Sequence, residues 1–161
     1  MSNIELIDKS IIEYYVAGAI EVLGSTCSLK VTSEKAKVNM SNDSYGEICG
    51  LIGFSSGNNA MSILITFTKP CILYVVEKML GETHATINKD IADAVGEISN
   101  MIHGFAKTKL NEKGYQVSMA LPTVIYGENL NLSKLKGTVS ILVPLKDDKD
   151  NKFFIEFTIP Q

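Results

Sequence analysis

Three polar residues, Asp93, Glu97 and Asn100, are separated by four and then three positions in the stretch DIADAVGEISNMIHGFAKTKL. Residues at these spacings lie on one face of an α-helix. A carboxamide beside a carboxylate suits a reaction at a labile phosphoryl group, where catalysis depends on positioning and charge compensation. Asn100 can accept a hydrogen bond from an attacking water and stays uncharged, so it would not repel an anionic phosphoryl group. Glu97 is better suited to pairing with a lysine or arginine of the molecule that carries the phosphoryl group.

The helix that would carry these residues has an apolar stripe on its opposite side. At about 100° per residue, the side chains that fall within roughly 40° of Ile91 are those of Val95, Ile98, Ile102 and Phe105. The three polar residues fall at roughly 180–240° from Ile91 on the same wheel. We therefore expect the stripe to face the core and the polar residues to face solvent.

Two further residues could shape this polar face. Gly104 also falls on it, and a mid-helix glycine costs about 1 kcal/mol relative to alanine. Close approach of another molecule to the backbone would explain Gly104, and relief of packing at Gly104 and Gly96 would explain it equally well. Pro122, which follows Asn100 after 21 intervening residues, could be a rigid rim beside the face or an ordinary strand boundary.

The polar face also has explanations that involve no function. Asp93 could assist docking, or it could only stabilise the first helical turn, where a negative charge is worth roughly 0.3–1 kcal/mol. Exposed Asp, Glu and Asn residues at helical spacing are common on solvated helix faces. The spacing alone therefore identifies candidates for a site and does not establish one.

Other kinds of site are not indicated. Cys27, Cys49 and Cys71 are odd in number and widely spaced, so we expect small, reduced core residues rather than a disulfide framework or a CxxC metal site. His84 and His103 lack partners at metal-ligand spacing. Neither a glycine-rich phosphate loop nor the nucleophile motif G-x-S-x-G occurs.

The composition fits one ordinary globular domain. The chain has 161 residues, of which 45% are hydrophobic and 20% charged, so we expect a single domain over residues 1–161 with a substantial core. The net charge of −3 and the scattered lysines argue against a nucleic-acid partner. No apolar run is long enough to span a membrane and the start of the chain lacks signal-peptide features, so a cytoplasmic location is expected.

The first half of the chain predicts two helices around a β-hairpin. An apolar face predicts a helix from about Ile4 to Leu23, ended by Gly24. The segments EICGLIGF and AMSILITF flank SSGNN and read as a hairpin. A short helix, CILYVVEKML, should follow, with Pro70 in its first turn and Gly81 at its end.

The second half repeats this order of elements. The long helix should run from about Lys89 to Leu110, with Asp90 as its candidate cap and NEKG as its stop. The segments YQVSMALP, TVIYG, GTVSILVPL and KFFIEFTI are expected to be strands. Helix, strand and apolar hairpin occur once in about residues 4–67 and again in about residues 88–160. The similarity could come from β propensity alone, but the order of elements favours a pseudo-duplicated α/β domain in which only the second half carries E-x-x-N.

With these motifs in view, the chain resembles the CheX phosphatases of bacterial chemotaxis, which are related to CheC and to flagellar switch proteins. The family pattern is Asp or Ser, then x3-E, x2-N and x21-P, and it is matched by Asp93, Glu97, Asn100 and Pro122. The segments DAVGEISNMIHGFAKTKL, LPTVIYGEN and KML-GE near Met79 also look like the family. The resemblance implies a CheC-like α+β domain with two long helices packed on a mainly antiparallel sheet, and a homodimer.

The same resemblance implies a substrate and residue roles. The substrate would be the phosphorylated aspartate of a CheY-like receiver, with Asn100 orienting the attacking water and Glu97 pairing with the receiver's lysine. Asp93, Gly104 and Pro122 would belong to the docking face. The divalent ion, usually Mg²⁺, would be held by the receiver, so no cofactor is expected in this chain.

A non-catalytic module that binds a receiver, such as a flagellar-switch-like protein, is the alternative. Exposed carboxylates and a glycine gap would suit such a module almost as well. The carboxamide of Asn100 favours the phosphatase, because docking alone does not require it.

Overall fold

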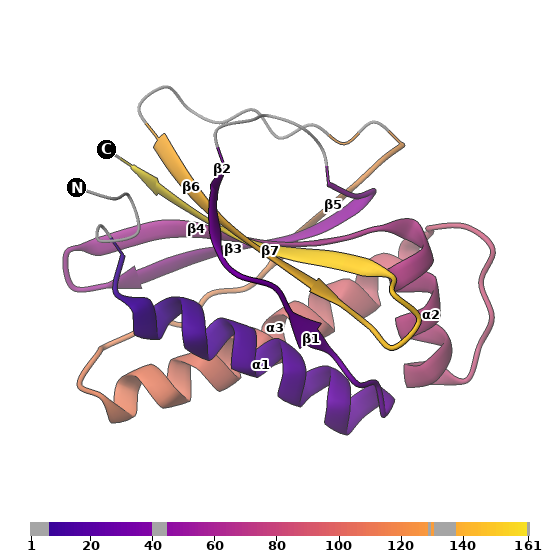
Figure 1. Cartoon of the computed structure of the whole chain (residues 1–161), viewed down its shortest axis with the longest axis horizontal. Coiled ribbons are helices and arrows are strands. Elements are labelled where there is room, and N and C mark those ends of the chain that lie inside the picture. Colours follow the sequence, from indigo (N-terminus) through magenta and orange to yellow (C-terminus); the bar gives the residue numbers. More distant parts are fainter. Residues whose placement is uncertain (1–6, 40–44, 129, 131–137, 161) are drawn as a thin grey trace.

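The computed structural model describes residues 7–39, 45–128, 130 and 138–160. These residues form the predicted α+β fold, with α1 and α3 side by side against one face of an antiparallel sheet (Figure 1). The elements in chain order are α1 (Lys9–Cys27), β1 (Thr32–Ser33), β2 (Lys37–Asn39), β3 (Ile48–Ser56), β4 (Asn59–Phe67), α2 (Lys69–Leu80), α3 (Lys89–Glu112), β5 (Thr123–Tyr126), β6 (Thr138–Lys146) and β7 (Lys152–Pro160).

The two halves of the chain contribute equivalent elements and exchange their edge strands. The β3–β4 hairpin and the β6–β7 hairpin meet at β4 and β7 in the middle of the sheet. The short strands β1 and β2 of the first half pair with β6, whereas β5 of the second half pairs with β3. This exchange confirms the predicted pseudo-duplication, and it means that neither half has its complete set of strand partners without the other.

The core lies between the helices and one face of the sheet. Alternate side chains of β4 and β7 are fully buried on this face, namely Ile63, Ile65, Phe67, Phe153, Ile155 and Phe157. The predicted stripe of α3 packs here, with Ile91, Val95, Ile98 and Ile102 fully buried and Phe105 half-buried. Alternation along the strands and the helical period therefore converge on one shared core.

The three cysteines are buried and unpaired, as expected from their spacing. Burial raises the pKa of the Cys49 thiol to about 11 and raises the pKa values of Cys27 and Cys71 as well. Protonated, buried thiols behave as small core residues and are poor nucleophiles.

The first helix ends later than predicted. Gly24 lies inside α1, which continues to the buried Cys27, and the end is made by Ser28 in the left-handed conformation (φ 55°). The amide of Ser28 donates to the carbonyl of Gly24. The apolar period continues through Cys27, so burial of this side chain outweighs the glycine stop. The helix also starts later than predicted, at Lys9, because the Asp8 side chain caps it by accepting from the amide of Ser10 at 2.9 Å, while Ile4 itself lies outside the described residues.

The ends of the other two helices agree more closely with the ends predicted from the sequence. Pro70 occupies the first turn of α2, and Gly81 ends that helix with φ 72°, as predicted. The cap of α3 is Asn88 and not Asp90, because the Asn88 side chain accepts from the amide of Ile91 at 3.1 Å. The helix then continues to Glu112, two residues beyond the predicted end.

The predicted strand over residues 115–122 does not form. The amide of Ser118 donates to the carbonyl of Ser55 at 2.9 Å, and Thr123 is the β-partner of Leu51. Between these two attachment points the segment contains one residue more than the facing stretch of β3. An extra residue cannot stay in the ladder, so the segment leaves the sheet edge between its two attachments. We call residues 118–123 the arch.

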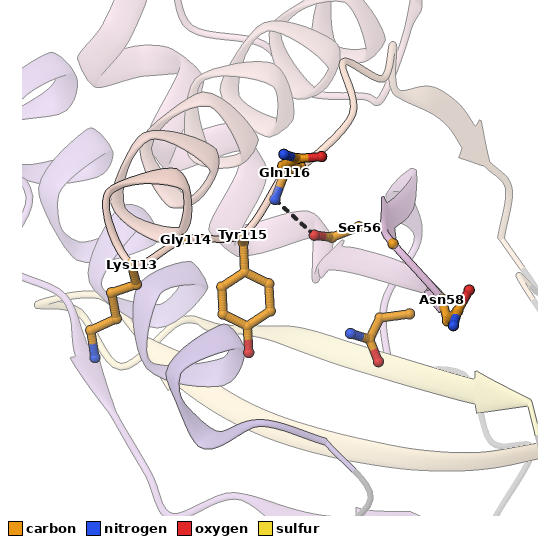
Figure 2. A pocket seen from close by; sticks show the side chains of 8 residues that line it. Ser56, Asn58, Lys113, Gly114, Tyr115 and Gln116 are labelled. Carbon is orange, nitrogen blue, oxygen red and sulfur yellow. Dashed lines mark hydrogen bonds between the residues drawn. The ribbon is translucent and has the colours of Figure 1, made fainter.

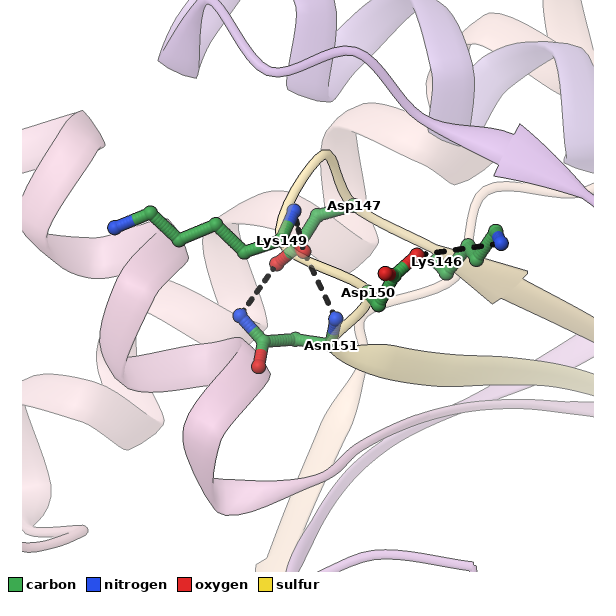
Figure 3. A network of polar contacts seen from close by, with 5 residues as sticks. All are labelled: Lys146, Asp147, Lys149, Asp150 and Asn151. Atoms are coloured by element: carbon green, nitrogen blue, oxygen red, sulfur yellow. Dashed lines mark hydrogen bonds and ion pairs between the residues drawn. The ribbon is translucent and has the colours of Figure 1, made fainter.

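The β6–β7 turn is held by a buried carboxylate. Asp147 is only 3% exposed, and its Oδ1 accepts from the amides of Lys149 and Asn151 at 2.9 and 3.0 Å. Its Oδ2 accepts from the side-chain amide of Asn151 at 3.0 Å (Figure 3). The aspartate thus replaces the solvent that these three donors would otherwise bind.

Replacement of Asp147 by alanine should therefore lower the free energy of unfolding by about 2–4 kcal/mol, because three donors lose their acceptor. Urea denaturation followed by circular dichroism measures this. The matched control is Asp148→Ala in the same turn, where the carboxylate is exposed and accepts from Tyr74 Oη at 3.2 Å, and the expected loss is about 0.5 kcal/mol. Equal losses for the two variants would contradict the assigned role of Asp147.

Candidate functional site

The polar face of α3 is open to solvent. Asp93, Glu97, Asn100 and Gly104 are all exposed, while the opposite side of the helix packs into the core. At 1.5 Å per residue these four positions extend over about 16 Å of the helix. The structure thus brings the helical candidates together on one accessible surface, as the wheel predicted.

The cap at Asn88 changes the interpretation of Asp93. The first turn of α3 contains Asp90, whereas Asp93 is the fifth residue of the helix. The effect of the helix dipole on a side chain fades beyond the first turn. A purely helix-stabilising role therefore fits Asp90 better than Asp93.

Tight packing under Asn100 fixes the helix on the sheet. Its neighbour Ser99 is fully buried, and a methyl group added to Gly50 of β3 would lie 2.1 Å from Ser99 Oγ and 3.0 Å from Ser99 Cβ. The strand and the helix can approach this closely only because residue 50 has no side chain. Glycine is therefore needed at this point to set the height of Asn100 above the sheet.

The Gly50→Ala variant should lose about 1–3 kcal/mol of stability, because an added methyl group must displace Ser99 or the helix. Thermal or urea unfolding measures the loss. The same substitution at Gly104, where nothing described lies within 4 Å of an added Cβ, should instead raise stability by up to about 1 kcal/mol. If both alanine variants changed stability in the same direction, the proposed contact would be wrong.

The two glycines of α3 have different surroundings. A Cβ on Gly96 would lie 3.5 Å from Val124 Cγ2 of β5, which is an ordinary packing contact. A Cβ on Gly104 would meet no described atom. Among the described residues, a packing contact therefore accounts for the glycine at position 96 but not for the one at position 104.

The arch contacts α3 through Ser118 and presents two apolar side chains to solvent. Met119 and Leu121 are 82% and 86% exposed, the highest values among the large hydrophobic residues described. Ala120 packs against the core, and Pro122 is half-buried just before β5. The sequence did not reveal this surface, since the expected strand would have hidden alternate side chains of the segment.

A buried histidine joins α1, α3 and the arch. His103 is 3% exposed, with Nδ1 2.6 Å from Tyr15 Oη of α1 and Nε2 3.3 Å from the carbonyl oxygen of Ser118. A carbonyl can only accept, so Nε2 carries the hydrogen and Nδ1 accepts from the tyrosine hydroxyl. Burial lowers the pKa of His103, which favours this neutral form. Sequence spacing gave no sign of this bridge because Tyr15 is 88 residues away.

A separate cavity lies at the far end of α3. It has a volume of about 490 Å³ and lies between the β3–β4 turn and the residues that follow the helix. Figure 2 shows Ser56, Asn58, Lys113, Tyr115 and Gln116 around it, with the amide of Gln116 donating to Ser56 Oγ at 3.0 Å. None of the predicted site residues lines this cavity.

The described residues contain neither a grouped set of metal ligands nor a membrane-spanning helix. In residues 7–39, 45–128, 130 and 138–160, no three His, Cys, Asp or Glu side chains are grouped so that they could hold a metal ion. Within the same ranges, every helix is too short or too polar to cross a bilayer.

Comparison with known proteins agrees with the predicted family and fold. The family model described as chemotaxis phosphatase CheX matches residues 48–146. A protein of Thermotoga maritima named CheY-P phosphatase CheX is 27% identical over 101 residues, which cover 62% of this chain and 64% of that protein. The chain thus corresponds to less than two thirds of this relative.

Two solved structures extend the similarity over nearly the whole chain. A CheC-like superfamily protein from Shewanella sp. PV-4 is 30% identical with a TM-score of 0.86, covering 96% of this chain and all of that chain. The CheX–CheY–BeF3–Mg²⁺ complex from Borrelia burgdorferi contains a chain of the same fold, 23% identical with a TM-score of 0.76, covering 94% of this chain and 98% of that chain. The family match over residues 48–146, together with this fold, shows that the chain belongs to the chemotaxis phosphatase CheX family.

Proposed function

We propose that this chain hydrolyses the aspartyl phosphate of a CheY-like response-regulator receiver. The observation that carries the proposal is the exposed amide of Asn100 one turn from the exposed carboxylate of Glu97, on a helix fixed to the sheet by its other side. Two relatives support the substrate class, because one is named a CheY-P phosphatase and the other was solved with CheY.

In the proposed reaction Asn100 orients a water molecule. The amide oxygen accepts a hydrogen bond from the water, whose oxygen attacks the phosphorus atom of the mixed anhydride. The bond between phosphorus and the aspartyl oxygen breaks, so the receiver regains its carboxylate, and inorganic phosphate and a proton are released. A neutral amide suits this position because it adds no negative charge beside the phosphoryl group.

The remaining residues of the face are assigned to docking. Glu97 would pair with a lysine of the receiver, which fixes the orientation of the two proteins. Asp93 would add a second negative charge on the same side of α3. Gly104 would allow the receiver backbone to approach the helix, and Pro122 would form a rigid border beside Asn100.

The divalent ion belongs to the partner in this proposal. Mg²⁺ is held by carboxylates and substrate phosphate oxygens, and these are present in a phosphorylated receiver. The Borrelia burgdorferi complex was solved with CheY, BeF3 and Mg²⁺ together. Homodimerisation and a cytoplasmic location are further parts of the proposal, testable by analytical ultracentrifugation and by cell fractionation.

The proposal is tested by adding the purified chain to each receiver of the host after phosphorylation with acetyl phosphate. A shortened lifetime of the aspartyl phosphate for at least one receiver would support the phosphatase and identify the substrate. If a receiver binds and its phosphate lifetime is unchanged or longer, the chain is a binding module instead. Absence of both effects for every receiver would defeat the proposal.

A further inference from the structure

The arch is attached to α3 on both sides of Asn100. At one end, the carbonyl of Ser118 accepts from His103 Nε2 at 3.3 Å. At the other end, Val124 of β5 faces Gly96 of the same helix. Asn100 lies between Gly96 and His103 on α3, so the start of the arch and the strand that follows it contact the stretch of helix that carries Asn100.

The arch is built to display apolar side chains and not to bury them. Alternate side chains of an extended segment point to opposite sides, and here Ala120 faces the core while Met119 and Leu121 face solvent. Backbone amides hold the start of the arch and the two residues before it: Gln116 donates to Ser56 Oγ, Val117 to Asn111 Oδ1 and Ser118 to the carbonyl of Ser55. Two large apolar side chains on a fixed backbone beside a candidate catalytic amide have the properties of a docking rim.

Among the hydrogen bonds that the arch itself makes, the one contributed by α3 comes from His103. Its ring is sealed between Tyr15 and the arch, and the neutral tautomer satisfies both nitrogens. Tyr15 donates to Nδ1, whereas only Nε2 reaches the arch. The two hydrogen bonds can therefore be removed separately.

We propose that His103 is a positioning residue, which holds the arch beside Asn100 so that Met119 and Leu121 dock an apolar patch of the phosphorylated receiver. This inference rests on the proposed function and adds a second, apolar contact to the polar face of α3. Without the His103–Ser118 hydrogen bond, the arch would be looser and would have to be ordered again when the receiver binds. Loss of this bond should therefore raise KM and leave kcat nearly unchanged. A merely structural role would reduce the amount of folded enzyme, which lowers the apparent kcat and leaves KM unchanged.

The test compares His103→Leu, His103→Gln and Tyr15→Phe in steady-state dephosphorylation of the receiver found by the screen, phosphorylated with acetyl phosphate. We expect KM to rise about fivefold or more for His103→Leu, and to recover for His103→Gln, which keeps a donor toward Ser118. Tyr15→Phe is the matched control, since it disturbs the same buried ring from the other side and should leave KM unchanged. Equal KM values for His103→Leu and wild type would overturn the proposal.

Two further measurements test the proposal even if His103→Leu does not fold or the screen finds no substrate. The surface variant Met119→Ser/Leu121→Ser should raise KM to a similar extent, and an unchanged KM would remove the docking rim even if His103→Leu failed to fold. Hydrogen exchange of the Val117 and Ser118 amides, which donate to Asn111 Oδ1 and to the carbonyl of Ser55, needs no receiver. Faster exchange in His103→Leu than in Tyr15→Phe supports the positioning role even if the screen finds no substrate, and equal exchange rates refute it.

Discussion

Replacement of Asn100 by alanine should slow dephosphorylation of the receiver by about two orders of magnitude or more at saturating concentration. Removal of one preorganised hydrogen-bonding group from an active site has an effect of this size. The exposed position of Asn100 means that the substitution opens no cavity in the core, and alanine favours the helix. The loss should therefore appear in kcat, with the affinity for the receiver largely kept.

The measurement is phosphate release from the phosphorylated receiver, together with the dissociation constant from titration. Asn58→Ala is a suitable control, because it removes another exposed amide, at the β3–β4 turn and not on the polar face of α3. A wild-type rate for Asn100→Ala would show that the amide does not orient the water. A weaker affinity with unchanged kcat would show that Asn100 acts in docking and not in catalysis.

Glu97→Lys should weaken association with the receiver by about tenfold or more. Reversing the charge turns an attraction to the receiver's lysine into a repulsion, and like charges across an interface are costly. The effect should appear in the dissociation constant and in the salt dependence of association. Titration at two ionic strengths measures both.

The assignment of a pairing partner requires a double-mutant cycle. Reversal of the receiver's lysine to glutamate should restore part of the affinity that Glu97→Lys loses. The double variant would then bind more tightly than the summed losses of the two single variants predict, which is the coupling expected of a direct pair. Glu112→Lys at the exposed end of α3 makes the same change in net charge on the same helix and should show little coupling. If the two glutamate variants behaved alike, Glu97 would act only through overall charge.

The periodicity of the sequence was sufficient to predict the orientation of the site. The apolar stripe of α3 and the alternation in β4 and β7 select one buried face each, so the outward direction of Asp93, Glu97 and Asn100 followed from spacing alone. The hairpins and the ends of α2 were also predicted, because Pro70 and Gly81 determine local backbone geometry without help from distant residues.

What could not be predicted depends on distant contacts. The extra residue in the arch becomes visible only when Ser118 and Thr123 are seen against β3. The role of His103 depends on Tyr15, a residue of another helix. Likewise, Gly24 has the properties of a helix stop, and only the burial of Cys27 shows why α1 continues past it.

The central claim is that a neutral amide at position 100 directs water to the aspartyl phosphate of another protein. The most direct test is the single-turnover decay rate of the phosphorylated receiver with saturating wild-type chain and with saturating Asn100→Asp. The aspartate has nearly the same shape and still accepts hydrogen bonds, but it places a negative charge beside the phosphoryl group. We predict that wild type accelerates the decay and that Asn100→Asp loses about 100-fold of that rate, the scale of a lost catalytic hydrogen-bonding group; equal decay rates for the two chains would contradict the account.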